Sequence, residues 1–487
     1  VGMNPNGGYD MARRKVIQYD PFVDTVDEAG GHGTHVAGTV AGHRSVDGKT
    51  ESDGTEDGVA RAARIAFVDC GKYCGEGCGS LSIPPTDHLM STGRAGGARL
   101  HSASWGSSFV RSGAPYRYDT QARNMDSWIF SNWDTLFIVA AGNDGRSGMR
   151  SVGSPAIAKN GLTVGAGYTS ETAYDENFVV DFSSEGPSPD GRILPHAVGP
   201  GVSIVSSQAI PSTVGECEPE APDALITMSG TSMATPAVSG GAALVRQYFQ
   251  DGYYPTGARN TSSAASIDIS GTLVKAVILN SGQQMTAKIR FGQVDSEFYD
   301  HIQGFGRVSL ADTLRIKDHN DIVARVVDKV TVNDQDSVIY KVTVNDTMCT
   351  GKELRATLVW ADPPGASGCV SCAVNDLDLT LTNDMDTSGQ TYYPNGESSK
   401  DYINNAERII VPASAMVDGH VWTARVRAAN LDRSSQQFSL IMSGCFLFDG
   451  YEGDIGFAAP PGAAPPGLRV GSALAAAALS AAYLLLF

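Results

Sequence analysis

Short hydrophobic runs alternate with polar and glycine-rich stretches over the first 317 residues of the chain. The clearest run covers residues 136–141, where apolar side chains follow one another without interruption. A continuous apolar run of this length is typical of a parallel strand that is buried on both faces. Shorter runs predict further strands at residues 15–19, 60–69, 99–104, 161–166 and 202–205.

Helical patterns fill several of the intervals between these strands. Small and apolar residues at 31–42 place His35, Thr39 and Gly42 along one side of a helix. Further helices are predicted at residues 118–133, 232–249 and 273–281. This alternation of strands and helices predicts an α/β fold with a doubly wound, mostly parallel sheet over residues 1–317.

The pattern changes at residue 323, where short alternating segments separated by turn residues begin. Several successive strands of this kind indicate an antiparallel β-sandwich. We expect this domain to cover residues 320–449, and a linker rich in Pro, Gly and Ala to follow at 450–469. The expected strands lie at residues 338–344, 354–360, 377–381, 408–411, 422–428 and 438–442.

The last residues, 470–487, form an uncharged hydrophobic tail. As a helix the tail would span roughly 27 Å, close to the thickness of the hydrocarbon core of a bilayer. Small residues, a Pro-rich spacer and a hydrophobic tail are also the elements of a lipid-anchor attachment signal. A lipid anchor and a single membrane span are therefore equal alternatives that predict membrane contact through the tail, and a soluble tail is the third.

The net charge of the chain indicates which kinds of partner it can bind. The formal net charge is −17 at pH 7, and no long run or stripe of Lys and Arg occurs. We therefore expect no binding to nucleic acid, whereas cation binding is compatible with this acidity. Asn375, Asp376 and Asp378 bring oxygen atoms close together and are candidate ligands for a structural calcium ion, although such residues in a turn need no metal.

The eight cysteines form an even set, which is compatible with disulfides and an oxidising compartment. Cys369 and Cys372 are spaced like half of a zinc knuckle. No second pair with histidine support follows them, so we do not expect zinc.

Three polar residues fall beyond the expected carboxyl ends of strands, where a doubly wound sheet binds its ligands. Ser104 ends one strand, Asn143 follows the run at 136–141, and Ser232 begins a helix whose N-terminal N–H groups favour negative charge. Taken alone, Ser232 fits a helix cap and Asn143 a turn equally well. His35, in a helix of small residues, is interpreted as a base rather than a core histidine.

Three segments resemble the subtilisin-like serine proteases, and the resemblance covers residues 1–317. The distal part is similar to the β-sandwich of oxidatively stable alkaline subtilases, through Leu358-Val359-Trp360, Pro363-Pro364-Gly365, Asn375-Asp376-Leu377-Asp378-Leu379 and Asn404-Asn405-Ala406-Glu407. The motifs of the catalytic part are Gly31-His32-Gly33-Thr34-His35-Val36-Ala37-Gly38, Ala140-Ala141-Gly142-Asn143 and Gly230-Thr231-Ser232-Met233-Ala234-Thr235-Pro236.

The resemblance implies a serine endopeptidase that acts on polypeptides through an acyl-enzyme. Ser232 would be the nucleophile, His35 its general base, and Asn143 a donor to the oxyanion. The strand end at Ser104, Trp105 and Gly106 would pair with an extended substrate, and with Ala140, Ala141 and Gly142 it would form walls of the specificity pocket. For Trp105, core packing is an equal alternative.

One departure from the family pattern concerns the catalytic aspartate. In subtilisin order it precedes the histidine and opens an Asp-Thr-Gly or Asp-Ser-Gly turn. None of Asp10, Asp20, Asp24 and Asp27 has this context. We therefore expect the catalytic aspartate to lie upstream of Val1, together with a propeptide and a signal peptide.

Two other functions compete with this interpretation. An α/β-hydrolase esterase is disfavoured because Ser232 is not in a Gly-x-Ser-x-Gly elbow and follows the histidine in sequence. A catalytically inactive surface or adhesion protein that keeps the fold is the remaining alternative. We expect a monomer outside the cell or at its surface, with polypeptide substrates, possible calcium and no organic cofactor.

Overall fold

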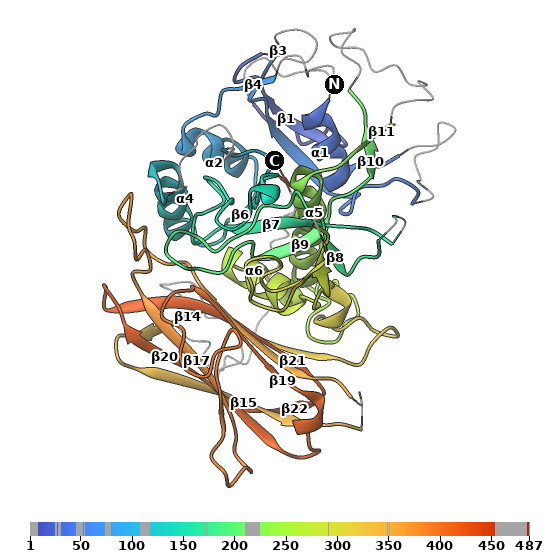
Figure 1. The fold of residues 1–487 in the computed structure, drawn as a ribbon. Coiled ribbons are helices and arrows are strands. Elements are labelled where there is room, and N and C mark those ends of the chain that lie inside the picture. Colours follow the sequence, from blue (N-terminus) through green and yellow to red (C-terminus); the bar gives the residue numbers. More distant parts are fainter. Residues whose placement is uncertain are drawn as a thin grey trace.

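The computed structural model describes residues 8–24, 27, 31–44, 52, 54–73, 79–107, 117–170, 172, 174–209, 225–290, 292–347, 349, 351–452 and 485–486. Two parts lie one above the other in Figure 1. The first part contains helices around a sheet, and the second, orange in the figure, consists of strands.

The central sheet of the first part is mostly parallel. Strands β5, β6, β7 and β9 run parallel to one another, and β8, β12 and β13 extend the sheet beyond β7. The strands span Leu100–Ala103 (β5), Leu136–Ala140 (β6), Leu162–Gly167 (β7), Phe178–Val179 (β8), Ala197–Pro200 (β9), Ala287–Lys288 (β12) and Val294–Asp295 (β13).

Helices cover both faces of this sheet, as the alternation of side chains along β6 demonstrates. Leu136 and Ile138 pack in one core with α5 and α6, whereas Phe137 and Val139 pack in another core with α2 and α4. Successive side chains of a strand point to opposite faces, so a run that is buried throughout needs a helix layer on each side. The helices span His32–Ala41 (α1), Thr86–Ala95 (α2), Thr120–Ser131 (α4), Thr231–Gln250 (α5) and Gly271–Asn280 (α6).

Smaller elements surround this core. Strands β1 and β2 pair in parallel, and β23 pairs with β2, while β3 with β4 and β10 with β11 form antiparallel pairs. These strands span Val16–Asp20 (β1), Arg64–Val68 (β2), Gly71–Tyr73 (β3), Gly79–Leu81 (β4), Ile204–Ser207 (β10), Leu225–Met228 (β11) and Leu485–Leu486 (β23). Short 3-10 turns occur at Gly145–Ser147, Ser263–Ala265, Leu310–Asp312 and Ala413–Ala415.

The second part consists of two antiparallel sheets, ordered β14-β21-β16-β19 and β18-β17-β20-β15-β22. Their facing side chains form one core that includes Leu358, Leu440, Leu379 and Val426. The first sheet contains Val323–Asn333 (β14), Leu354–Trp360 (β16), Ala406–Val411 (β19) and Ser435–Gly444 (β21). The second contains Ser337–Val344 (β15), Asp376–Asn383 (β17), Thr391–Tyr392 (β18), Val421–Asn430 (β20) and Phe446–Glu452 (β22).

The outer face of the first sandwich sheet is buried as well. Val326, Val359 and Ile441 alternate with the side chains of the sandwich core and join the core cluster that contains α6. Helix α6 therefore lies between the central sheet and the sandwich, and the two parts share one continuous hydrophobic core.

The predicted fold class, a doubly wound sheet followed by an antiparallel β-sandwich, is confirmed. The expected strand at 202–205 is β10, which pairs with β11 and not with the parallel sheet, and β9 was not predicted. Helix α2 was also missed, and β22 continues to Glu452, within the segment predicted as a linker. The domain boundaries themselves stay predictions.

The predicted hydrophobic tail at 470–487 lies outside the described residues except for Leu485–Leu486. Among the helices that the structure describes, none has both the length and the apolar character needed to cross a bilayer.

Candidate active site

Helix α5 begins one residue before Ser232, so the serine lies in its first turn. Pro236 lacks an N–H group, which leaves the Ser232 carbonyl without the usual partner four residues on. The Ser104 hydroxyl supplies the missing donor at 2.8 Å, and the Ser232 hydroxyl donates to the Ser104 carbonyl at 3.3 Å. The two hydrogen bonds join the end of β5 to the start of α5.

Asn143 is oriented by Thr231, the residue before Ser232. The Oδ1 atom of Asn143 accepts from both the Thr231 N–H and the Thr231 hydroxyl, each at 2.9 Å. Because Oδ1 is held in this way, the Nδ2 protons of the exposed Asn143 amide are directed away from Thr231. Gly142 precedes it with φ 108, a conformation that favours glycine.

Helix α1 carries the predicted base, His35. It begins after Gly31, whose φ of 59 is left-handed and whose Cα lies too close to Ala209 for a side chain. Asp27 accepts from the Thr34 N–H at 3.1 Å and from the Thr34 hydroxyl at 2.5 Å, in the first turn of the helix.

His35 is fully buried, and its ring contacts β10. Nε2 donates to the Ile204 carbonyl at 3.0 Å, and Nδ1 has no hydrogen-bond partner among the described residues. Burial lowers the pKa of His35, and the carbonyls of Ile204 and Ile226 oppose this shift. With its proton on Nε2, the ring in this orientation is not positioned to accept a proton from a serine.

The expected hydrogen bond between His35 and Ser232 is not formed, since Nε2 bonds Ile204 and the Ser232 hydroxyl bonds Ser104. No carboxylate in the described ranges hydrogen-bonds His35. Asp20 contacts His88, and Asp69 accepts from the Tyr19 hydroxyl and the Gly71 N–H.

A cavity of about 930 Å³ brings most of the predicted site residues together. It is lined by Ser232 and Asn143 and by all six residues predicted to bind substrate, Ser104, Trp105, Gly106, Ala140, Ala141 and Gly142. His35 is absent from its wall, although His32, Gly33 and Thr34 of the same helix belong to it. Trp105 is half-buried and packs against the edge of Phe137, so it serves both the core and the cavity.

Sequence reasoning missed one further stretch of the cavity wall, beside the segment that follows β5. Gly153, Ser154 and Ala156 line it there. The Ser154 carbonyl accepts from the Ser107 N–H at 2.8 Å and the Ser107 hydroxyl at 3.0 Å. Nothing in the local pattern marks residues 153–156, because their role depends on contacts with distant segments. The role of Thr231 was also missed, although its place directly before Ser232 was visible.

The predicted calcium residues lie at the start of β17. Both polar side-chain atoms of Asn375 are engaged, with Gln436 at 2.6 Å and the Asp432 N–H at 2.8 Å. Lys400 forms an ion pair with Asp378 at 2.5 Å. Within the part of the chain that the structure describes, no three His, Cys, Asp or Glu side chains are grouped to hold a metal ion. Calcium binding here stays a prediction.

The chain belongs to the subtilase family. Residues 9–306 match the profile described as Subtilase family, which is more than half of the chain. The match includes the helix of His35, the Asn143 segment and the start of α5.

Named relatives agree with this assignment. The chain is 26% identical to the serine protease/ABC transporter B family protein tagD of Dictyostelium discoideum, over 93% of this chain and 30% of that protein. It is 30% identical to serine protease AprX of Bacillus subtilis, over 50% of this chain and 53% of that protein. The chain thus spans less than a third of the length of tagD.

Among solved structures, fervidolysin from Fervidobacterium pennivorans, titled a keratinolytic enzyme related to subtilisin, is similar with a TM-score of 0.41. The identity is 20%, and the alignment covers 84% of this chain and 49% of that one.

Proposed function

We propose that the protein is a serine endopeptidase that hydrolyses peptide bonds through an acyl-enzyme. Ser232 attacks the carbonyl carbon, and His35 accepts its proton and later gives it to the leaving amine. The Asn143 amide and the Ser232 N–H donate to the oxyanion of the tetrahedral intermediate.

The observation that carries the proposal is the shared cavity. Residues from three distant segments, Ser104, Asn143 and Ser232, line it, and hydrogen bonds through Thr231 and Ser104 hold them together. A hydroxyl at a helix N-terminus beside an oriented amide suits a reaction in which negative charge develops on a carbonyl oxygen. The extended edge at Ser104 to Gly106 supports a polypeptide as substrate.

The proposal includes a carboxylate that orients His35 and is supplied by a segment upstream of Val1. The buried Nδ1 of His35 without a partner supports this assignment, because a buried ring nitrogen normally has one. A carboxylate on Nδ1 would place the proton there and leave Nε2 free to act as the base. The complete reading frame should then contain an Asp-Thr-Gly or Asp-Ser-Gly turn upstream.

A fluorophosphonate probe on the full-length protein tests the catalytic assignment. We expect labelling of the wild type and none of Ser232→Ala, with Ser239→Ala as a matched control on the same helix that keeps labelling. Absence of labelling in the wild type would favour the inactive surface or adhesion protein instead.

Three further expectations accompany this function. We propose a monomer that works outside the cell or at its surface. The Cys349–Cys445 and Cys369–Cys372 disulfides support this location, since such bonds persist in oxidising compartments. We also propose membrane contact through the tail at 470–487. If a structural calcium ion binds near Asp376 and Asp378, a chelator lowers the melting temperature of the wild type but not of Asp378→Asn.

A further inference from the structure

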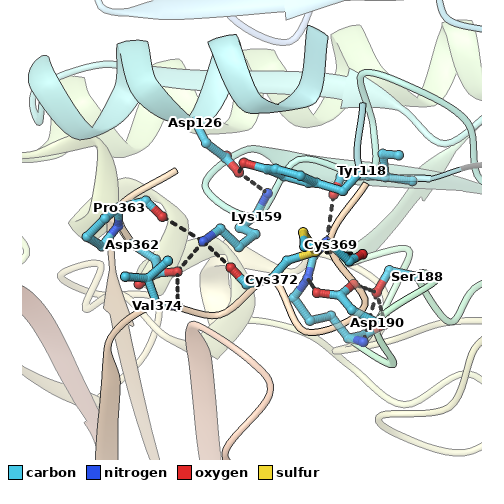
Figure 2. Close-up of a disulfide and its surroundings, with 12 residues drawn as sticks. Tyr118, Asp126, Lys159, Ser188, Asp190, Asp362, Pro363, Cys369, Cys372 and Val374 are labelled. Carbon is cyan, nitrogen blue, oxygen red and sulfur yellow. Dashed lines mark hydrogen bonds and ion pairs between the residues drawn. A yellow bond between two sulfur atoms is a disulfide. The ribbon is translucent and has the colours of Figure 1, made fainter. Parts of the chain in front are cut away.

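A loop of the second part, residues 361–375, contacts the first part at Lys159, three residues after Ala156 of the cavity wall. At its base Lys159 is fully buried and donates to Asp362, to the Pro363 carbonyl at 2.7 Å and to the Cys372 carbonyl at 2.6 Å. Figure 2 shows the Lys159 ammonium group enclosed by these acceptors. The hydrogen bonds of the Lys159 ammonium group therefore depend on the conformation of this loop.

The loop is closed by a disulfide between Cys369 and Cys372, beside Lys159 in Figure 2. The bond fixes a short ring whose last residue presents its carbonyl to Lys159. Gly365 lies against this ring, and a side chain there would meet the Cys372 carbonyl at 2.9 Å. The disulfide thus holds one of the acceptors of the buried ammonium in place.

The same ring reaches solvent on its other side. Cys372 is buried, Cys369 is half-buried, and Val370 between them is 89% exposed. Because Cys369 is the less buried residue of the pair, we expect a dithiol to attack its sulfur rather than that of Cys372. This arrangement makes the bond accessible to reduction without prior unfolding.

Two chains of hydrogen-bonded residues lead from this loop to the cavity wall. Through the first, Lys159 follows a turn in which the Ile157 and Ala158 N–H groups donate to the carbonyls of Gly153 and Pro155. Gly153 lines the cavity.

Through the second route, the Gly368 N–H donates to the Tyr118 carbonyl at 2.6 Å. The next residue, Asp119, accepts from the Ser154 hydroxyl at 2.7 Å, and Ser154 lines the cavity. Asp126 links the two routes, since it accepts from the Tyr118 hydroxyl and from the N–H groups of Lys159 and Asn160.

We propose that the Cys369–Cys372 disulfide is a redox-sensitive support of the substrate cavity, with Lys159 as the positioning residue that transmits its state. A dithiol reductant breaks the S–S bond, two S–H bonds form, and the reductant leaves as a disulfide. The opened ring no longer fixes the Cys372 carbonyl, so residues 153–160 loosen and substrate binds more weakly. The proposal rests on the proposed peptidase function for the identity of the cavity.

The test compares the oxidised and reduced full-length protein on a peptide substrate, with the state of each cysteine verified by alkylation and mass spectrometry. We expect reduction to raise KM about three- to tenfold while kcat changes less than about twofold, the size of effect for one weakened polar contact. Cys369→Ser/Cys372→Ser should show the raised KM already and no response to dithiothreitol. The control Cys349→Ser/Cys445→Ser, which removes the Cys349–Cys445 disulfide instead, should keep the response.

Amide hydrogen exchange of residues 153–160 gives a second measurement that needs no activity. We expect faster exchange after reduction in the wild type and in the control variant. Unchanged KM and unchanged exchange with a demonstrably opened Cys369–Cys372 bond would overturn the inference. Absence of peptidase activity in both states would overturn the proposed function alone, and the exchange data would still decide the redox support.

Discussion

Thr231 makes two hydrogen bonds to a single acceptor, Oδ1 of Asn143. Its hydroxyl also accepts from the Gly142 N–H at 3.3 Å. These contacts fix which end of the Asn143 amide points toward the place where the oxyanion would form in the proposed reaction. The backbone bond alone would allow the Asn143 side chain to rotate about it, so the hydroxyl is the part that determines orientation.

We expect Thr231→Val to lower kcat about tenfold with little change in KM, because the oriented donor acts mainly on the transition state. Valine matches threonine in shape, so packing is kept in this fully buried position. Thr231→Ser retains the hydroxyl and should keep most of the activity. Steady-state kinetics on a peptide substrate decide the matter, and an equal loss in both variants would contradict the assigned role.

Asp376 is the second residue whose surroundings lead to a measurable effect. Burial, followed by the negative charge of Asp378, raises the pKa of Asp376 to about 6. The folded chain therefore binds a proton at Asp376 more tightly than the unfolded chain does, because aspartates of an unfolded chain have a pKa of about 4. The corresponding stability is present below about pH 4 and is lost as the pH rises through 6.

Asp376→Asn should remove this pH dependence. Relative to wild type, the variant should gain about 1 kcal/mol in unfolding free energy between pH 4 and pH 8, a value reduced because the side chain is half exposed. Urea unfolding at a series of pH values, in the presence of a chelator so that no metal ion binds this carboxylate, measures the gain. The exposed Glu397→Gln serves as the control and should show no such gain, and a gain of equal size there would contradict the explanation.

At the scale of elements, the C-terminal end of α6 is capped by the sandwich. The guanidinium of Arg408 donates to the carbonyls of Leu279 and Phe305 at 2.7 and 2.9 Å. Arg355 donates to those of Asn280 and Gly282. The last carbonyls of a helix have no intrahelical partners and carry partial negative charge, so two cations from another domain satisfy both needs.

Arg408→Met should destabilise the protein by about 3 kcal/mol, because buried carbonyls lose their donors and the guanidinium no longer lies over the rings of Phe298 and Tyr299. Arg425→Met, at a site on β20 where the side chain is exposed, is the matched control and should change stability by less than about 0.5 kcal/mol. Chemical denaturation measures both. Similar values for the two variants would show that the cap contributes nothing.

The sequence predicted correctly the elements that are buried over most of their length, because burial gives such an element a clear apolar pattern. The run at 136–141 is β6, and the long apolar stretch after Ser232 is α5. Helix α2 was missed because only Leu89, Met90 and Gly93 of its residues are buried and all the others except Ala95 are polar. Strand β9 was missed because a short segment containing Gly and Pro has no periodic signal of its own.

At the scale of the whole molecule, the two parts are joined by buried polar contacts as well as by the shared core. Lys159 and Asp362 form an ion pair with both side chains almost inaccessible to solvent. Asn160 exchanges hydrogen bonds with Asp362 through the Asp362 N–H and carbonyl, at 2.8 Å each. Breaking such a pair leaves a buried charge without a partner, which costs about 3 to 5 kcal/mol.

Calorimetry of the intact chain should therefore show one cooperative transition that includes both parts. Lys159→Met should lower the midpoint temperature of that single transition. Neither part can unfold alone without exposing the core around α6. Two separate transitions in the wild type, or a sandwich transition that the variant leaves unchanged, would contradict this coupling.

These long-range contacts also set the limit of the prediction from sequence. The cavity residues Ser104, Asn143 and Ser232 could be grouped because each follows a predicted strand or begins a predicted helix. The pairing of Lys159 with Asp362 joins residues 203 positions apart and leaves no local pattern. The orientation of His35 could not be predicted either, since it depends on the carbonyl of Ile204 in a distant strand.

Helix α6 has a consequence for how the sequence can vary. Its residues from Leu273 to Asn280 are all buried, because the central sheet covers one side and the sandwich the other. Most helices have a solvent face on which substitutions accumulate freely, and this one has none. We expect neutral drift and laboratory evolution alike to spare this helix, so that changes of surface charge or solubility are better sought on α2, which keeps most of its side chains in water.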